Sequence, residues 1–173
     1  MDYVLKAIQQ LLLAGVAAGS SPIANVKEVI IGAHKQIPQD SLPAILVYAN
    51  NVEYLGVNTA KERLKATVSV VLIFNARSFY EKDTIQSTDN IVYSFLDMLQ
   101  MVQGATSVSN QTPTTNTIIQ ILTNNTLLPY SGTPTCSTSR VSGVEYRKEG
   151  ESNRSFPTVE AEVTLEVDIV HTR

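Results

Sequence analysis

Four carboxylates in the last part of the chain are the side chains that could most readily do chemistry. They are Glu160, Glu162, Glu166 and Asp168. Their even spacing places them on one face of an extended strand, with about 7 Å between alternate positions. Such a group could hold a metal ion or act as acid and base. However, the only nearby histidine is His171, and the segment lacks the glycine-containing loop that calcium sites use. The pattern therefore predicts a solvated or interfacial sheet face and not a metal site.

The other reactive side chains have no partners for chemistry in the neighbouring sequence. His34 follows an apolar segment, and no Ser, Cys or Asp lies where it could form a catalytic pair with it. Cys136 is the single cysteine, so a disulfide within the chain is impossible, and its polar surroundings predict a free loop thiol. The sequence has no phosphate-binding glycine loop, zinc-type cysteine spacing or nucleophile elbow. We therefore expect no catalytic residues, no cofactor, no metal and no enzymatic activity.

Composition describes a globular chain with few charges. Of 173 residues, 43% are hydrophobic and 17% are charged, and the net charge is −3. Scattered basic residues in an acidic chain argue against nucleic acid as a direct ligand, because phosphate binding needs a concentrated basic surface. No segment approaches the roughly 20 apolar residues of a membrane span. The apolar N-terminal run contains Asp2, Gln9 and Gln10, which disfavours a signal peptide. We expect a soluble protein without a membrane partner.

A strand followed by a helix forms the scaffold that must position these side chains. Every second residue is apolar over Leu64–Phe74, which is the period of a half-buried strand. Val71 and Ile73 replace the polar residues of the other face, so the strand should run into a region that is covered on both sides. The apolar period then becomes helical over Asp83–Gln103, and Gly104 is suited to end that helix.

Shorter elements precede and follow this scaffold. Periodicity predicts an amphipathic helix at Asp2–Ala14 and short strands at Val26–Ala33, Ala44–Ala49, Val52–Leu55 and Ile118–Leu122. A turn at Asn50-Asn51 would separate two of these strands, and short loops favour an antiparallel meander. The chain closes with a predicted hairpin of Val141–Lys148 and Thr158–Val170, and the carboxylates lie on its second arm.

Two polar segments are expected to be long surface loops, one at residues 105–117 and one at residues 123–140. Both are rich in Thr, Ser and Asn, and loops of this length in a compact domain are commonly functional or disordered. Together, these elements predict one α+β domain over residues 1–173. Its mostly antiparallel sheet would be flanked by an N-terminal helix and one long internal helix, and it would end in a closing β-hairpin.

This order of elements resembles the tail terminator proteins of tailed bacteriophages. The likeness lies in the N-terminal helix, a strand entered through a proline at Leu42–Val47, the central strand, the helix Asp83–Gln103 and a closing hairpin that runs nearly to the C-terminus. It covers most of the chain and rests on element order, without an invariant motif. The resemblance implies α+β subunits that form a six-membered ring, which caps the tail tube and joins it to the head. It brings no catalytic residue.

The resemblance also implies location and partners. The chain would be a structural protein of the virion tail or neck, assembled in the host cytoplasm. It would contact further copies of itself, tail tube or sheath proteins and head–tail connector proteins, and DNA would pass through the ring without specific binding. Two alternatives stay open. One is a head–tail connector or stopper protein of the neck, and the other is a non-viral protein-binding module.

Large side chains on polar loops are expected at contacts between subunits or rings. The candidates are Arg77, Phe79 and Tyr80 in the loop Asn75–Lys82, and Leu127, Leu128 and Tyr130 in the second polar segment. Aromatic residues and Arg are enriched in interface cores, and large apolar side chains on a polar loop reduce solubility unless something covers them. The alternative is that these residues fold back onto their own domain.

The carboxylate face of the closing strand is expected to line the channel of the ring. A wall of negative charge would repel the DNA backbone and prevent it from sticking during passage. The competing interpretation is that the carboxylates pair across strands with Lys65, Arg147 or Lys148, or that they lie on the outer rim of the ring.

Overall fold

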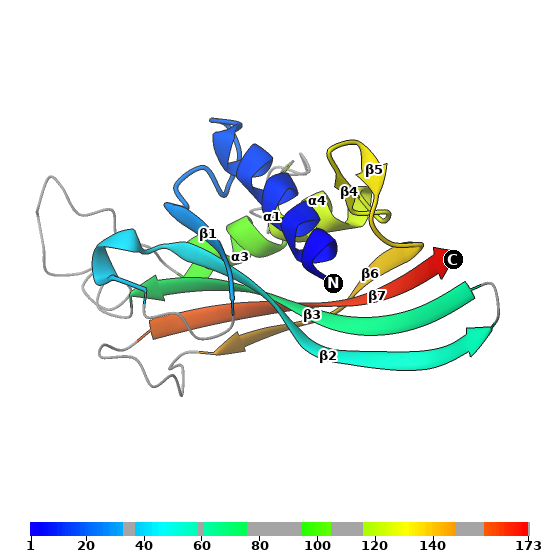
Figure 1. Ribbon diagram of the computed structural model, residues 1–173. Helices are drawn as coiled ribbons and strands as arrows, with labels where there is room; N and C mark the ends of the chain where they lie inside the picture. Colours follow the sequence, from blue (N-terminus) through cyan, green and yellow to red (C-terminus); the bar gives the residue numbers. More distant parts are fainter. Residues whose placement is uncertain (33–36, 59–60, 76–94, 105–115, 148–157, 173) are drawn as a thin grey trace, which may run out of the picture.

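The computed structural model describes residues 1–32, 37–58, 61–75, 95–104, 116–147 and 158–172, which form a mixed α+β fold. Its helices lie on one side of a five-stranded sheet, and the far ends of two strands extend past them (Figure 1). In chain order the elements are α1 (Asp2–Ala17), β1 (Glu28–Ile31), the short 3₁₀ helix η1 (Gln39–Ser41), β2 (Ala44–Asn58), β3 (Lys61–Asn75), α3 (Phe95–Val102), α4 (Ile118–Asn124), β4 (Pro129–Tyr130), β5 (Thr133–Pro134), β6 (Thr138–Arg147) and β7 (Thr158–Thr172).

The sheet has the strand order β1-β2-β3-β7-β6, and only the β1–β2 pair is parallel. Its centre is the antiparallel pair of β3 and β7, in register from Lys61↔Thr172 to Asn75↔Thr158. The apolar side chains that alternate along β7 are all buried: Val159, Ala161, Val163, Leu165, Val167 and Ile169. The two strands with the clearest period of two are therefore neighbours in the middle of the sheet, and both sequence predictions are confirmed.

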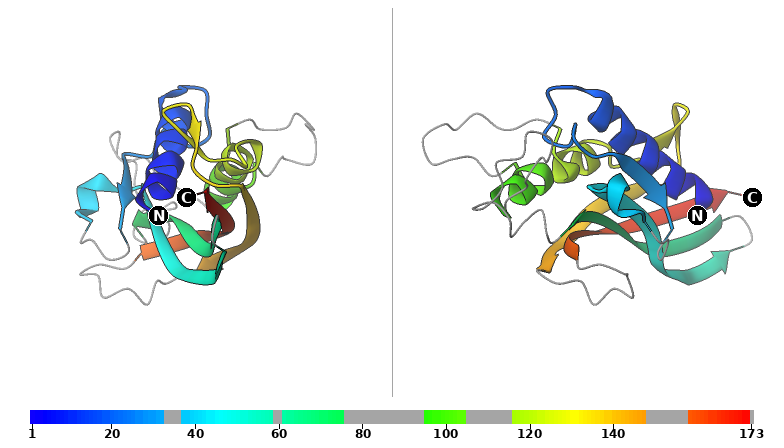
Figure 2. Two further views of the ribbon diagram at one scale, coloured as in Figure 1. Left: turned by 45° about the vertical axis from the view of Figure 1, so that its right-hand side comes forward. Right: turned by 90° about the vertical axis from the view of Figure 1, so that its left-hand side faces the viewer.

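The main core lies between this sheet and the helices (Figure 2). The predicted N-terminal helix is confirmed as α1, and the residues that it buries are Val4, Ala7, Ile8, Leu12 and Gly15. A Cβ atom at Gly15 would lie 2.5 Å from Ile121 Cδ1, so the glycine lets α1 approach α4 closely. These contacts fix the helix layer over one part of the sheet only.

A second, smaller core covers the other face of the sheet at the end of β3. Val71 and Ile73 are buried there with Ala44 and Leu46 of β2, under Ile37 and Leu42 from the segment that enters β2. The Leu42–Pro43 peptide bond in that segment is cis. The prediction that β3 runs into a region covered on both faces is therefore confirmed.

Two predictions about the early strands were wrong. β1 pairs with β2 in parallel and not in a meander, because the connection over residues 32–43 is long enough to cross the sheet. The expected turn at Asn50-Asn51 is a β-bulge between Ala49 and Asn51 within one continuous strand. The Asn50 side-chain amide donates a hydrogen bond to the Ser69 hydroxyl of β3, so the extra residue is accommodated without a turn.

The expected strand at Ile118–Leu122 is instead the helix α4. A short apolar run does not distinguish a buried strand from a buried helix. The distinguishing signal is the start of the helix: Thr117 Oγ1 accepts a hydrogen bond from Gln120 N at 3.2 Å, and Gln120 Oε1 accepts one from Asn116 N at 2.6 Å. The expected loop at residues 123–140 is also structured in part, because it contains β4, β5 and the start of β6.

Only the end of the predicted helix Asp83–Gln103 can be described, as α3. Met98 and Val102 are buried there, and Gly104 has φ +73° and donates its N–H to the carbonyls of Leu99 and Gln100. The prediction that Gly104 ends the helix is confirmed. The first part of the predicted helix, and most of the polar segment at residues 105–117, lie outside the described residues.

Candidate assembly interface

The ends of β2 and β3 form an arm that extends past the helix layer (Figure 1). We define the arm as residues 50–58 of β2 with residues 61–67 of β3, which pair from Asn51↔Thr67 to Asn58↔Lys61. A second bulge lies between Tyr54 and Gly56, where Gly56 takes φ +142°, a value that favours glycine. The arm is thus an antiparallel ribbon that is regular between the two bulges, over residues 51–54 of β2.

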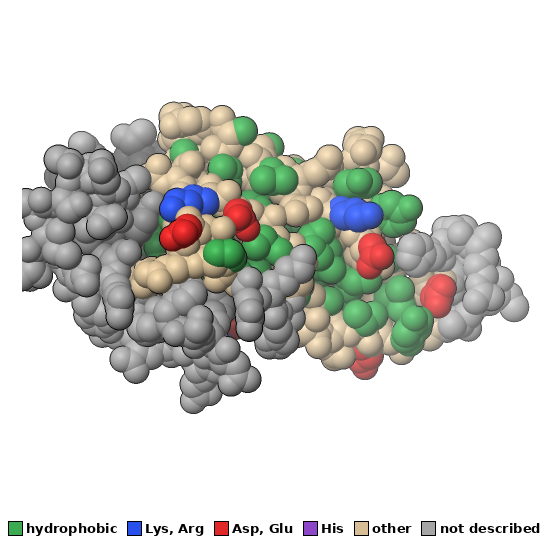
Figure 3. Space-filling view, turned by 60° about the vertical axis from the view of Figure 1, so that its left-hand side comes forward, with side chains coloured by type: hydrophobic (Ala, Val, Ile, Leu, Met, Phe, Trp, Pro, Cys, Tyr) green, Lys and Arg blue, Asp and Glu red, His purple; other side chains and the backbone are tan. Residues whose placement is uncertain are grey.

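The arm carries large apolar side chains in solvent. Tyr54 is 69% exposed, Leu55 49% and Val52 39%. Val52 lies opposite Ala66 and Tyr54 opposite Leu64, so both project from the face of the sheet that the helices cover elsewhere. Figure 3 shows hydrophobic side chains gathered over one part of the described surface, with only scattered charges among them. An exposed apolar patch of this kind is a candidate contact surface.

Among the described residues, part of β2 and the outer side of β6 have no neighbouring strand. β1 covers only residues 44–47 of β2, so within the described part of the chain the edge of β2 has no partner strand from Tyr48 onward. β6 is the last strand on the opposite side, and its outer edge likewise has no partner strand among the described residues. Open strand edges are templates for pairing with another chain.

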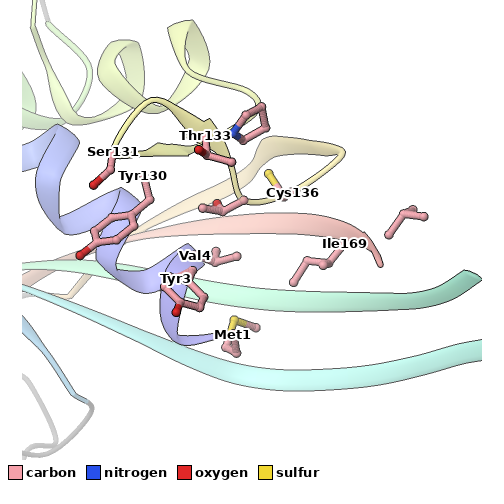
Figure 4. A pocket seen from close by; sticks show the side chains of 11 residues that line it. Met1, Tyr3, Val4, Tyr130, Ser131, Thr133, Cys136 and Ile169 are labelled. Carbon is pink, nitrogen blue, oxygen red and sulfur yellow. The ribbon is translucent and has the colours of Figure 1, made fainter. Parts of the chain in front are cut away.

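An open apolar pocket of about 470 Å³ lies beside the start of α1 (Figure 4). The first turn of α1, the β4–β5 hairpin, Cys136 and the end of β7 line it. Tyr3, which is 66% exposed, and Tyr130 form an aromatic pair whose ring centroids are 5.8 Å apart. Ile169 of β7 lines the pocket, and Ile169 pairs with Leu64 of β3, opposite Tyr54. The pocket therefore adjoins the apolar side of the arm.

Cys136 is a free thiol, as expected, but it is buried and not a solvated loop residue. Its Sγ atom lies 3.5 Å from the Thr126 carbonyl oxygen, and it belongs to the main core. Burial, assisted by the nearby Asp168 carboxylate, raises the pKa of the Cys136 thiol to about 11. The polar neighbours in the sequence gave no sign of this, because the chain folds the cysteine inward from a surface turn.

We expect Cys136 to react slowly with a thiol reagent while the protein is folded. The pKa rises from 9.0 to about 11, so at pH 8 the folded chain should hold roughly 100-fold less thiolate than the unfolded chain. The stability that the neutral thiol contributes is present below its ordinary pKa and is lost as the pH rises through about 11. Reaction rates with and without denaturant measure the difference, and equal rates would contradict burial.

The four carboxylates of β7 lie on the sheet face opposite the helices, where two of them are paired with cations. Glu166 Oε2 lies 2.7 Å from Arg140 Nη2 and 3.3 Å from Lys65 Nζ. Hydrogen bonds from Arg140 and then Lys65 lower the pKa of Glu166, so it is charged at neutral pH. This stabilisation is present above the ordinary carboxyl pKa and is lost as the pH falls through the lowered value. Pairing with Lys65 across strands is thus confirmed.

Glu162 and Glu160 are less exposed than a solvated face would imply. Glu162 Oε2 lies 3.0 Å from Arg147 Nη2, its other carboxylate oxygen accepts a hydrogen bond from the Ser69 hydroxyl, and its side chain is only 13% exposed. Glu160 is 8% exposed and accepts a hydrogen bond from the Thr158 hydroxyl at 3.0 Å. Within the single chain Glu160 is therefore buried and not solvated, whereas Glu166 and Asp168 are half-buried.

The predicted contact residues separate into three groups. Arg77, Phe79 and Tyr80 lie outside the described residues. Leu127 is 46% exposed and Tyr130 is half-buried, so both can contact another molecule. Leu128 is fully buried in its own core, which corrects the prediction that it contacts a neighbour. The exposed residues of the arm were missed, because Val52–Leu55 was interpreted only as a weak strand.

Other kinds of site were also sought. His34 lies outside the described residues. In the part of the chain that the structure describes, no group of three or more His, Cys, Asp or Glu side chains is placed to hold a metal ion. Among the same residues, no helix has both the length and the apolar character needed to span a bilayer.

The candidate contact surfaces lie at the margins of the sheet, as an apolar arm, two strand edges and a pocket. Each presents groups that another macromolecule could cover. No protein-family model matches the sequence, and a search of curated proteins finds no match.

Proposed function

We propose that this chain is a non-enzymatic, ring-forming structural protein of a phage virion, of the kind that terminates a tail and joins it to the head. The observation that carries the proposal is the arm. Its exposed Val52, Tyr54 and Leu55 project beyond the helix layer, next to an unpaired strand edge. An exposed apolar surface of this kind is stabilised when a partner covers it. In a ring, that partner is a neighbouring copy of the same chain.

The order of elements supports the more specific part of the proposal. An N-terminal helix, a strand entered through Pro43, a long central strand and a closing strand that ends near the C-terminus are the features shared with tail terminator proteins. The proposed subunit also has one long internal helix that ends at Gly104, and a closing hairpin made of β6 and β7. Its partners would be tail tube or sheath and head–tail connector proteins. The related position of connector or stopper in the neck is the nearest alternative.

In this proposal the polar face of the sheet lines the channel through which DNA passes. Among the described side chains of β2, β3, β6 and β7, six carboxylates share that face with four cations: Glu53, Glu145, Glu160, Glu162, Glu166 and Asp168 with Arg63, Lys65, Arg140 and Arg147. The paired carboxylates are partly neutralised, so repulsion of DNA would come mainly from the excess of acidic groups. A surface of paired charges and threonine hydroxyls still offers no concentrated basic footprint to which phosphates could bind.

A second candidate function is a stand-alone protein-binding module, which the pocket beside α1 favours. Its volume of about 470 Å³ lies in the range of ligand sites, and Tyr3 and Tyr130 give it an aromatic rim. Such a module would be monomeric when no partner is present, which separates it from a ring subunit.

Light scattering on the purified chain tests the proposal. We expect a species of about six times the 18.9 kDa chain mass, whose fraction rises with protein concentration. The result that would count against a ring is a particle with the mass of one chain at every concentration. That outcome would favour the binding module.

A further inference from the structure

Two open edges of the same sheet match each other in strand direction. In the sheet β3 runs antiparallel to β2, β7 runs antiparallel to β3, and β6 runs antiparallel to β7. β6 therefore runs opposite to β2. A rotation about a ring axis that lies along the strands preserves strand direction. The β2 edge of one copy would then meet the β6 edge of the next copy in an antiparallel arrangement, as in the rest of the sheet.

We propose that residues 52–54 of β2 pair with residues 139–141 of β6 in a neighbouring copy, with Glu53 opposite Arg140, so that the sheets of successive subunits form one continuous ring. Both segments are regular, because the bulges lie outside them, after Ala49 and Tyr54 in β2 and after Val141 in β6. They also lie at nearly the same level of the sheet. Through β3, residues 52–54 are level with residues 167–169 of β7, and residues 139–141 pair with residues 165–167 of β7.

The two edges also match in charge on the polar face of the sheet. Glu53 is exposed, and it lies on the same face as Lys65 and Asp168. Arg140 lies on this face of β6, level with Glu166, and its side chain is 74% exposed although its Nε and Nη2 atoms both donate to Glu166 Oε2. The junction would bring Glu53 of one copy next to Arg140 of the following copy. The β2 edge thus contributes a negative charge and the β6 edge a positive charge, which attract each other.

The helix side of the junction is apolar on both partners. The β2 edge contributes Val52 and the exposed Tyr54. The β6 edge contributes Val141, which is half-buried, and beside it Leu127, which is 46% exposed. Leu127 follows Thr126, whose carbonyl accepts a hydrogen bond from the Ser139 hydroxyl at 3.0 Å, so this loop lies against β6. One contact would thus cover the exposed residues of both edges.

This inference rests on the proposed ring and names the surfaces that close it. When a sheet closes into a ring, its outer surface has more room than its inner surface, so a layer of helices on one face fits best on the outside. The helix layer would then face outward and the polar face inward, toward the channel. A head-to-tail contact leaves no edge free once the ring is complete, so growth stops at a fixed number of subunits.

Cysteine cross-linking tests the junction directly. One single-site variant carries Asn51→Cys and a second carries Ser142→Cys, because these residues lie opposite each other when Glu53 faces Arg140. Thr138→Cys, four residues away on β6, and Leu13→Cys on α1 are the exposed controls. The native Cys136 is buried and should not interfere. We expect a disulfide-linked dimer only when Asn51→Cys is mixed with Ser142→Cys, because the bond requires Cα atoms within about 7 Å.

Charge reversal provides the second readout. Glu53→Arg and Arg140→Glu should each weaken assembly roughly tenfold or more, and the double variant should restore it. Arg147→Glu is the matched control, because Arg147 lies level with Glu160, away from the junction, and should not rescue Glu53→Arg. The double variant Glu53→Arg, Arg140→Glu also lacks the Arg140–Glu166 ion pair within the chain. Restored assembly in this variant therefore cannot be an effect of that pair.

The outcomes separate this inference from the proposed function. Dimers formed by Asn51→Cys alone, or by a β6 variant alone, would mean like edges meet and would overturn the inference. A second result would also overturn the inference: light scattering shows a ring for the wild type, but no mixed pair of variants cross-links and the double charge variant does not restore assembly. In that case the proposed function would still stand. A wild-type chain that stays monomeric would overturn both.

Discussion

Replacing Leu128 by alanine should lower the free energy of unfolding by about 2–5 kcal/mol, the range for removing a large apolar side chain from a packed core. Leu128 is fully buried in the main core although it follows an exposed residue in a short loop. Its N–H donates to the Asn125 carbonyl at 2.9 Å, and its own carbonyl accepts a hydrogen bond from the Thr135 hydroxyl at 2.6 Å. These bonds hold the backbone, so the site should collapse little and leave a cavity.

The neighbouring Leu127 is the matched control for this prediction. It has the same side chain at the next position but is 46% exposed, so Leu127→Ala should change the free energy of unfolding of the single chain by less than about 0.5 kcal/mol. Urea denaturation of both variants, at a concentration too low for assembly, measures the difference. Equal losses for the two leucines would mean that Leu128 is not a core residue.

The largest expected effect on assembly comes from the arm. The double variant Tyr54→Ser, Leu55→Ser should reduce association at least about 100-fold for each contact, because one buried aromatic side chain contributes about 3 kcal/mol. Both side chains are about half or more exposed in the single chain, so their loss should leave folding intact. Light scattering measures assembly, and the far-ultraviolet circular dichroism spectrum checks the fold.

A matched double variant separates the arm from general surface hydrophobicity. Tyr3→Ser, Leu13→Ser removes one tyrosine and one leucine of similar exposure, 66% and 45%, from α1. It should assemble like the wild type if the arm forms the contact. Loss of assembly in this variant alone would place the contact at the pocket beside α1 and contradict the role of the arm.

The sheet was predictable wherever a segment repeated with period two over enough residues. The alternation in β7 and in Leu64–Phe74 fixed both strands and the buried face of each, because a shift of one residue would expose every apolar side chain. Short apolar runs were not predictable in this way. Ile118–Leu122 fits a strand and a helix equally, and its helical start depends on Thr117 and Gln120.

The candidate contact surface was harder to predict than the fold. Exposure of Tyr54 depends on where the helix layer ends, which no local pattern in β2 encodes. The sequence likewise contains nothing that distinguishes Leu127 from Leu128, since their burial is decided by the direction of a loop. The pairing of Glu166 with Arg140 needs the register of β6 on β7, which a bulge after Val141 sets. These features arise from tertiary structure.

Electron micrographs of virus particles assembled without this chain test the proposed function most directly. If the chain terminates the tail and joins it to the head, its removal should give filled heads and separate tails of variable length. Adding the purified protein should restore joined particles, whereas the Tyr54→Ser, Leu55→Ser variant should not. Joined particles with tails of normal length, formed in the absence of the chain, would contradict a role in tail termination or head–tail joining.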